Sequence, residues 1–154
     1  NFIQYEAPTG PHPLDENTTT IEATSEIFDW VRQQKPEAKF YIYANWPEMD
    51  LQQAFPPNLP NQNEIDAYYN FTLNAFMDWW IDYQNTMLLN NPDWNTRMIP
   101  VGSILTKIIQ DVIPNQIAFN ELYEDSAPHG RANLYFLAGA ITYMAIYEEP
   151  LPNS

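Results

Sequence analysis

The feature of this sequence that most constrains its fold is a short, apolar, β-rich run between two helical patterns. Lys39 to Asn45 reads KFYIYAN, and Pro36 and Pro47 bound it. Apolar residues recur at helical spacing on either side of the run, along residues 20–34 and again along residues 61–90. With the strand expected over residues 1–6, the helical pattern before this run becomes a helix between two strands, which is typical of a βαβ unit. The run therefore predicts a buried strand of a parallel sheet.

The remaining segments extend this alternation. Residues 1–6 are expected to form another strand, residues 7–19 an irregular proline-rich loop, and residues 97–101 a strand that ends near Pro100. The apolar segment from Leu134 to Tyr147 is expected to form a buried final helix. This order predicts a single α/β domain over residues 1–154, with three α/β/α layers around a doubly wound, mainly parallel sheet.

Local signals mark where the helices begin. Thr20 or a neighbouring threonine can cap the first helix, and Asn61 followed by Glu64 resembles a capping box for one long helix ending near Asn90. The aromatic residues along that long helix recur at helical spacing, which indicates core packing. Ser103 can cap a shorter helix after the third strand.

Composition excludes several classes of function. Twenty acidic and six basic residues give a net charge of −14, which argues against nucleic acid and anionic membranes as partners and fits an extracellular or periplasmic setting. The chain has no cysteine, and its two histidines, His12 and His129, form no zinc motif. Its four glycines form no phosphate-binding loop. We therefore expect no metal or other cofactor.

One loop carries the most chemically suggestive residues. Glu124 and Asp125 lie five and four positions before His129, just ahead of the final helix. A carboxylate beside an imidazole can orient it as a general base, and the sequence leaves open which of the two acids does so. Asn45 and Trp46 follow a predicted strand end, where they could line a substrate crevice, although Trp46 could equally fill the core.

Three stretches taken together resemble the C-terminal part of SGNH (GDSL-type) hydrolases. They are KPEAKFYIYANWP at 35–47, RMIPVGSIL at 97–105 and LYEDSAPHGRANLYFLAGAITYMAIY at 122–147. The resemblance implies a flavodoxin-like sheet and ester hydrolysis by a serine nucleophile, with His129 as general base and Asp125 as its orienting acid. It also implies an ester substrate, with an acylated carbohydrate as one option.

The chain departs from that family in two places. The family's acid lies three residues before the histidine, where this chain has Ser126, and the Gly-Asp-Ser block that carries the nucleophile is absent. We expect the serine in sequence preceding residue 1, so the isolated chain should be inactive and should associate with a missing N-terminal fragment or a second copy. Ser103 is an internal candidate. The alternative function is a non-catalytic SGNH-like binding or assembly module that has lost the triad.

Overall fold

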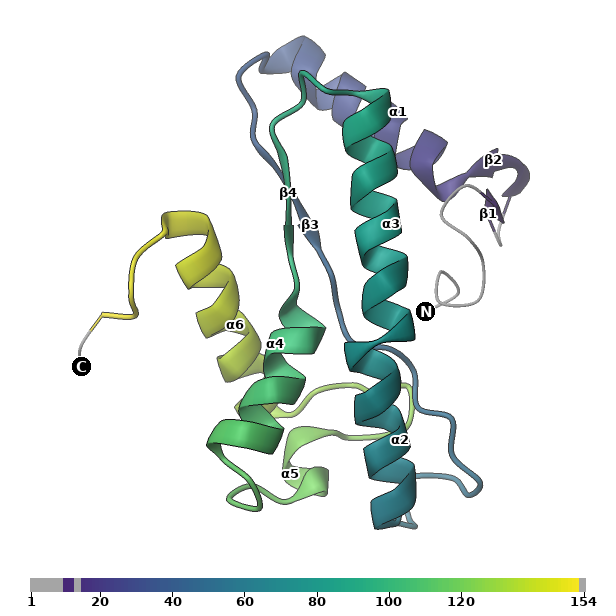
Figure 1. Ribbon diagram of the computed structural model, residues 1–154, viewed down its shortest axis with the longest axis vertical. Helices are drawn as coiled ribbons and strands as arrows, with labels where there is room; N and C mark the ends of the chain where they lie inside the picture. Colours follow the sequence, from purple (N-terminus) through teal and green to yellow (C-terminus); the bar gives the residue numbers. More distant parts are fainter. Residues whose placement is uncertain (1–9, 13–14, 153–154) are drawn as a thin grey trace.

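The computed structural model of the protein describes residues 10–12 and 15–152, and the strand predicted over residues 1–6 lies outside them. The described part is a mixed α/β structure (Figure 1). Its elements are β1 (Pro11–His12), β2 (Asp15–Thr19), α1 (Thr20–Gln34), β3 (Phe40–Tyr43), α2 (Gln62–Leu73), α3 (Ala75–Asn90), β4 (Thr96–Ile99), α4 (Val101–Lys107), the π-helical segment η2 (Ile108–Val112), α5 (Phe119–Leu122) and α6 (Ala132–Tyr147).

The two predicted strands β3 and β4 pair in parallel at the centre of the molecule. Phe40 lies opposite Thr96, and the register continues without a break to Tyr43 and Ile99. In Figure 1 the strands run side by side, with α3 on one side of them and α6 on the other. The mixed α/β class and the parallel pairing are confirmed. Within the described residues this sheet has two strands, so the wider doubly wound sheet stays a prediction.

The segment before α1 differs from the irregular loop that we predicted over residues 7–19. Pro11–His12 pairs antiparallel with Asp15–Thr19, so the prediction is wrong for these residues. Paired strands satisfy backbone donors and acceptors that a loop would leave to solvent, and the threonines Thr18 and Thr19 favour extended backbone.

Two helices begin at the caps that the sequence indicates, and in both the cap is a reciprocal capping box. Thr19 Oγ1 accepts the Glu22 N–H at 3.1 Å, while the Glu22 carboxylate accepts the Thr19 N–H at 2.8 Å. Asn61 and Glu64 make the same reciprocal pair at 3.1 and 2.8 Å. Each pair satisfies two backbone N–H groups that a helix start would otherwise leave unbonded. The predicted starts of α1 and α2 are therefore confirmed, with Thr19 as the threonine cap.

The single long helix predicted over residues 61–90 is wrong at Asn74. There the backbone leaves helical geometry, with φ −115° and ψ −96°, and the chain divides into α2 and α3. The Asn74 side-chain amide donates to the Asn70 carbonyl at 2.8 Å and to the Asn70 side-chain oxygen at 3.0 Å. An asparagine side chain that bonds the preceding turn competes with the helix's own hydrogen bonds, which accounts for a break without proline or glycine.

The core lies in two parts on either side of this break. One part joins α2, α4, α5 and α6 around Val101, Leu105 and Leu134, and the other joins α1, α3 and the sheet around Ile42, Trp80 and Met87. The predicted burial of the aromatic stripe is confirmed, because these side chains lie inside: Tyr68, Phe76 and Tyr83.

Helix α6 buries one face rather than its whole circumference. Leu134, Ala138 and Ile141 face the core, whereas Phe136 is 71% exposed and Tyr147 is 62% exposed. The final helix, which we expected to be buried, is therefore buried on one face only, because the apolar segment meets packing partners on one side. No helix in the described residues is long and apolar enough to cross a membrane.

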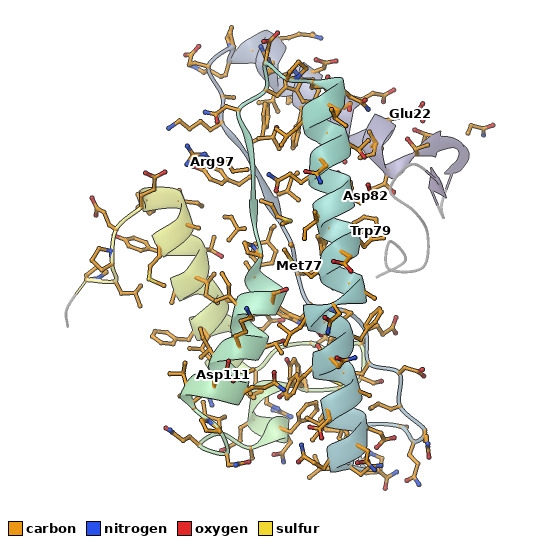
Figure 2. The ribbon with its side chains drawn as sticks, viewed as in Figure 1. Glu22, Met77, Trp79, Asp82, Arg97 and Asp111 are labelled. Carbon is orange, nitrogen blue, oxygen red and sulfur yellow. The ribbon has the colours of Figure 1, made fainter. Side chains whose placement is uncertain are left out.

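A salt bridge joins the end of α6 to the sheet. Arg97 reaches from β4 toward α6 (Figure 2), and its guanidinium lies 2.6 Å from the Glu148 carboxylate. Both side chains are more than half exposed, so this pair adds little to stability.

Candidate functional site

The candidate site is built on the loop of residues 123–131, which connects α5 to α6. The loop folds back on itself, so that Tyr123 and Gly130 form an antiparallel bridge and the Glu124 N–H donates to the His129 carbonyl at 2.7 Å. These bonds close the base of the loop and present the residues between them at its tip.

Asp125 and His129 are in direct contact at this tip. The Asp125 Oδ2 and His129 Nδ1 atoms are 2.7 Å apart. The other carboxylate oxygen accepts the backbone N–H groups of Ala127 at 3.0 Å and His129 at 3.1 Å. Because an acidic oxygen faces Nδ1, a neutral His129 carries its proton on that nitrogen and leaves Nε2 as the basic one. The arrangement therefore fixes both the tautomer and the direction of the imidazole.

The contact between Asp125 and His129 shifts the pKa of each side chain in the direction that favours its charged form. The hydrogen bond that the Asp125 carboxylate accepts from His129 Nδ1, and then the charge of that carboxylate, raise the pKa of His129 above its usual 6.5. The same hydrogen bond is the main cause that lowers the pKa of Asp125 below 3.8. The His129 side chain is 64% exposed, so its outer nitrogen is open to an incoming reactant. His129 is a stronger base than a free histidine, and it is neutral only above its raised pKa.

Of the two acids that the sequence left open, Asp125 is the one that contacts His129. Glu124 acts on the imidazole only through its charge, the smallest of the causes that raise its pKa. Ser126, at the position where SGNH hydrolases carry their acid, is engaged through its backbone: its N–H donates to Phe55 at 3.2 Å and its carbonyl accepts from Met49 at 3.0 Å. The four-residue spacing is thus accommodated by a turn centred on the Asp125 carboxylate.

The segment that follows β3 holds this loop in place. The Trp46 indole N–H donates to the Pro128 carbonyl at 2.9 Å, next to the two bonds that Ser126 makes with the same segment. The Trp46 ring also lies 6.4 Å from the Tyr135 ring, centre to centre. Trp46, predicted to bind substrate, therefore contacts the loop that carries His129. A contact with substrate stays a prediction.

Asn45, the other predicted substrate residue, lies at a close contact between β3 and α4. Its Oδ1 atom is buried and has no hydrogen-bond partner within the described residues. Its backbone oxygen lies where a Cβ on Gly102 would approach to 2.4 Å, and the Gly102 N–H donates to the Ala44 carbonyl at 3.0 Å. Sequence reasoning did not predict this close contact at Gly102, although a glycine directly after a strand is a known signal of close backbone approach.

Ser103 does not have the capping role that we predicted for it, and its candidacy as an internal nucleophile stays a prediction. Helix α4 already begins at Val101, so Ser103 lies inside its first turn, and the prediction that it caps the helix is wrong. The close approach at Gly102 lets the chain pass from β4 into α4 without an intervening loop. Ser103 Oγ lies 3.5 Å from the Thr72 carbonyl, and no hydrogen bond joins any serine to His129 in the part of the chain that the structure describes.

Metal chemistry has no visible site in the described residues, since no group of three or more His, Cys, Asp or Glu side chains there could hold an ion. No family model matches this chain, and no curated protein or solved structure matches it either. The likeness to SGNH hydrolases therefore rests on the three stretches of sequence given above.

Proposed function

We propose that this chain supplies the general base of a serine ester hydrolase of SGNH type that acts on a carbohydrate ester or another small acyl ester. The observation that carries the proposal is the 2.7 Å contact between Asp125 and His129, made in the loop and order that the resemblance implies. An acid-bound, exposed imidazole with its outer nitrogen free to accept a proton is the arrangement that activates a serine.

In this mechanism His129 acts twice. Its Nε2 takes the proton of the serine hydroxyl as the serine oxygen attacks the ester carbonyl, and Asp125 stabilises the resulting imidazolium. The imidazolium then gives that proton to the departing alcohol. Water repeats the sequence on the acyl-serine, releasing the acid and restoring the serine. Backbone donors beside the serine would stabilise the oxyanion.

The serine in this proposal comes from polypeptide outside these 154 residues. Within residues 10–12 and 15–152 the parallel sheet consists of the two strands β3 and β4, whereas parallel sheets are normally wider and covered. Tyr43 at the end of β3 is 42% exposed and Tyr135 at the start of α6 is 54% exposed. A segment that added strands beside β3 would cover this surface, and the carboxyl end of its strand would then lie near His129.

The test is to express this chain within its natural coding sequence, measure the intact masses of the purified polypeptides and assay hydrolysis of p-nitrophenyl acetate. The proposal expects a Gly-Asp-Ser block in the purified material. It also expects a loss of kcat of about 100-fold or more in His129→Ala, the usual contribution of a general base. His12→Ala, the matched control, should retain full activity.

Three results would count against the proposal. Full activity in His129→Ala would remove the base from the mechanism, and loss of activity in Ser103→Ala would place the nucleophile inside this chain. A purified 154-residue chain that is alone, folded and inert would instead favour the second candidate, a non-catalytic binding or assembly module. The observation on that side is that no described serine bonds to His129.

A further inference from the structure

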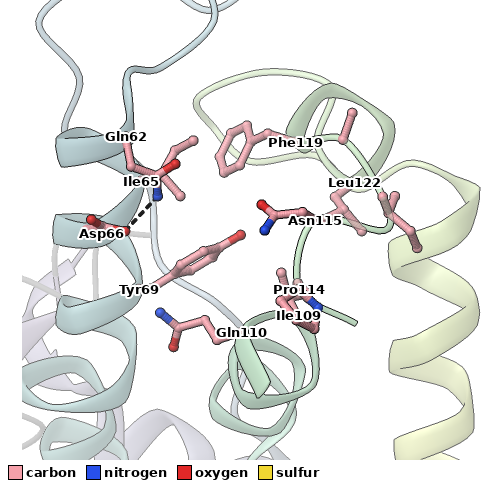
Figure 3. A pocket seen from close by; sticks show the side chains of 12 residues that line it. Gln62, Ile65, Asp66, Tyr69, Ile109, Gln110, Pro114, Asn115, Phe119 and Leu122 are labelled. Carbon is pink, nitrogen blue, oxygen red and sulfur yellow. Dashed lines mark hydrogen bonds between the residues drawn. The ribbon is translucent and has the colours of Figure 1, made fainter. Parts of the chain in front are cut away.

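A cleft of about 470 Å³ opens between α2, the end of η2 and α5 (Figure 3). Its volume lies within the ~300–1,000 Å³ typical of small-molecule sites. Neither Asp125 nor His129 lines it, so it is separate from the candidate catalytic loop. What it could bind follows from the side chains that face it.

Tyr69 is the polar group set deepest in this cleft. Its side chain is only 6% exposed, yet its hydroxyl points into the open space toward Asn115 (Figure 3). Within the described residues this hydroxyl has no hydrogen-bond partner. Burial, and then the charge of Asp66, raise the pKa of Tyr69 to about 12, so the hydroxyl stays neutral and can both donate and accept. Because the hydroxyl opens onto the cleft and is not sealed inside the protein, a ligand in the cleft can reach it.

The other polar side chains lie on both walls. On α2 the Gln62 amide donates to Asp66 Oδ1 at 2.8 Å, which fixes the pair and leaves one carboxylate oxygen and one amide oxygen as acceptors. On the opposite wall Gln110 and Asn115 contribute amides that offer both donors and acceptors. Among the residues that the structure describes, no basic side chain lines the cleft.

This set of groups selects for a neutral, hydroxyl-rich molecule. Hydroxyls both donate and accept, as do the phenol and the amides, whereas an anion would meet Asp66 and a chain of net charge −14. An organic cation would leave the amide N–H groups without acceptors. Phe119 and Ile65 provide an apolar wall for the carbon face of a ring. We propose that this cleft binds a neutral sugar through one pyranose unit, independently of the Asp125–His129 pair.

The experiment is a titration of the 154-residue chain with glucose, xylose, galactose and N-acetylglucosamine, followed by NMR chemical shifts. At least one sugar should bind with a Kd on the order of 1 mM, a value typical of a weak small-molecule site. Tyr69→Phe keeps the buried ring and removes only the hydroxyl, so it should raise that Kd about fivefold to tenfold, the loss of one hydrogen bond. Gln110→Ala, on the exposed opposite wall, should also weaken binding.

Tyr147→Phe is the matched control, because Tyr147 is an exposed tyrosine outside the cleft, and it should leave the Kd unchanged. Absence of binding by all four sugars, or tighter binding of choline or spermidine, would overturn the proposal. So would a sugar affinity that survives both Tyr69→Phe and Gln110→Ala. Sugar binding that persists in His129→Ala would leave this cleft standing even if the esterase proposal fails.

Discussion

Replacing Trp46 with phenylalanine tests whether the indole holds the loop that carries His129. The variant keeps an aromatic ring but loses the N–H that donates to the Pro128 carbonyl at 2.9 Å. Pro128 is buried, so its carbonyl would lose its donor in a place that water reaches poorly. Trp46 itself packs against the larger of the two core clusters, where the smaller ring fits less fully.

The expected cost follows from these two changes. A typical hydrogen bond contributes about 1 kcal/mol net, and a buried acceptor left unpaired costs about 1–3 kcal/mol. We therefore expect Trp46→Phe to lower the free energy of unfolding by about 2 kcal/mol. For a domain of this size that corresponds to a Tm about 4–8 °C lower.

Urea unfolding followed by circular dichroism measures this change, with the m-value expected to stay constant. Trp30→Phe is the matched control, because Trp30 is 66% exposed on α1 and its replacement should change the free energy by less than about 0.5 kcal/mol. In the same variant, NMR titration should find the pKa of His129 closer to 6.5, since a loosened loop weakens the Asp125 contact. A Trp46→Phe protein as stable as the original, with the pKa of His129 still fully raised, would refute the reasoning.

Three further perturbations test other parts of the structure. Gly102→Ala should destabilise the fold by about 1–3 kcal/mol in thermal melts, because its Cβ would lie 2.4 Å from the Asn45 oxygen; an unchanged Tm would mean that the contact is looser than described. Asp125→Asn should return the pKa of His129 toward 6.5. Because that pKa is raised in the folded state, the pair's contribution is full below about pH 6.5 and is lost as pH rises through the raised value, so urea unfolding should reveal a larger loss at about pH 5.5 than at about pH 9. The opposite order would contradict the ion pair. Leu134→Ala, at a fully buried position, should cost about 2–5 kcal/mol in urea unfolding, and a loss below about 1 kcal/mol would place Leu134 outside the core.

Patterns within short stretches of sequence predicted the helix starts, the strands and the buried aromatic positions. The threonine cap of α1, the capping box at Asn61, the parallel strands β3 and β4 and the burial of the aromatic stripe all follow from residue type and spacing. The break at Asn74 could not be read in this way, because its cause is a side-chain bond back to Asn70 in a segment that otherwise favours helix. The sequence could not indicate which face of α6 is buried, because the helix carries apolar residues on all of its faces. Only the tertiary contacts determine that Leu134 and its neighbours face the core.

In the candidate site, too, the sequence indicated the residues involved, and the tertiary structure determined their contacts. The sequence indicated His129 and two possible acids. Sequence separation alone could not decide whether Glu124 or Asp125 contacts the imidazole. The choice depends on a turn in which Asp125 accepts two backbone N–H groups, a geometry set by the loop as a whole. Trp46 was expected near a strand end, but its bond to the Pro128 carbonyl spans 82 positions of sequence and has no local signature.

The loop that carries His129 is positioned largely by its main chain. Ser126 is held through its own N–H and carbonyl, Pro128 through its carbonyl, and Glu124 through its N–H, none of which depends on the side chain at that position. Side chains at such positions can drift during evolution, or be exchanged by an engineer, while the imidazole keeps its place. Among homologues built this way, the backbone conformation of the loop would be conserved longer than its amino-acid sequence. The geometry around the histidine would then indicate homology more reliably than any sequence motif.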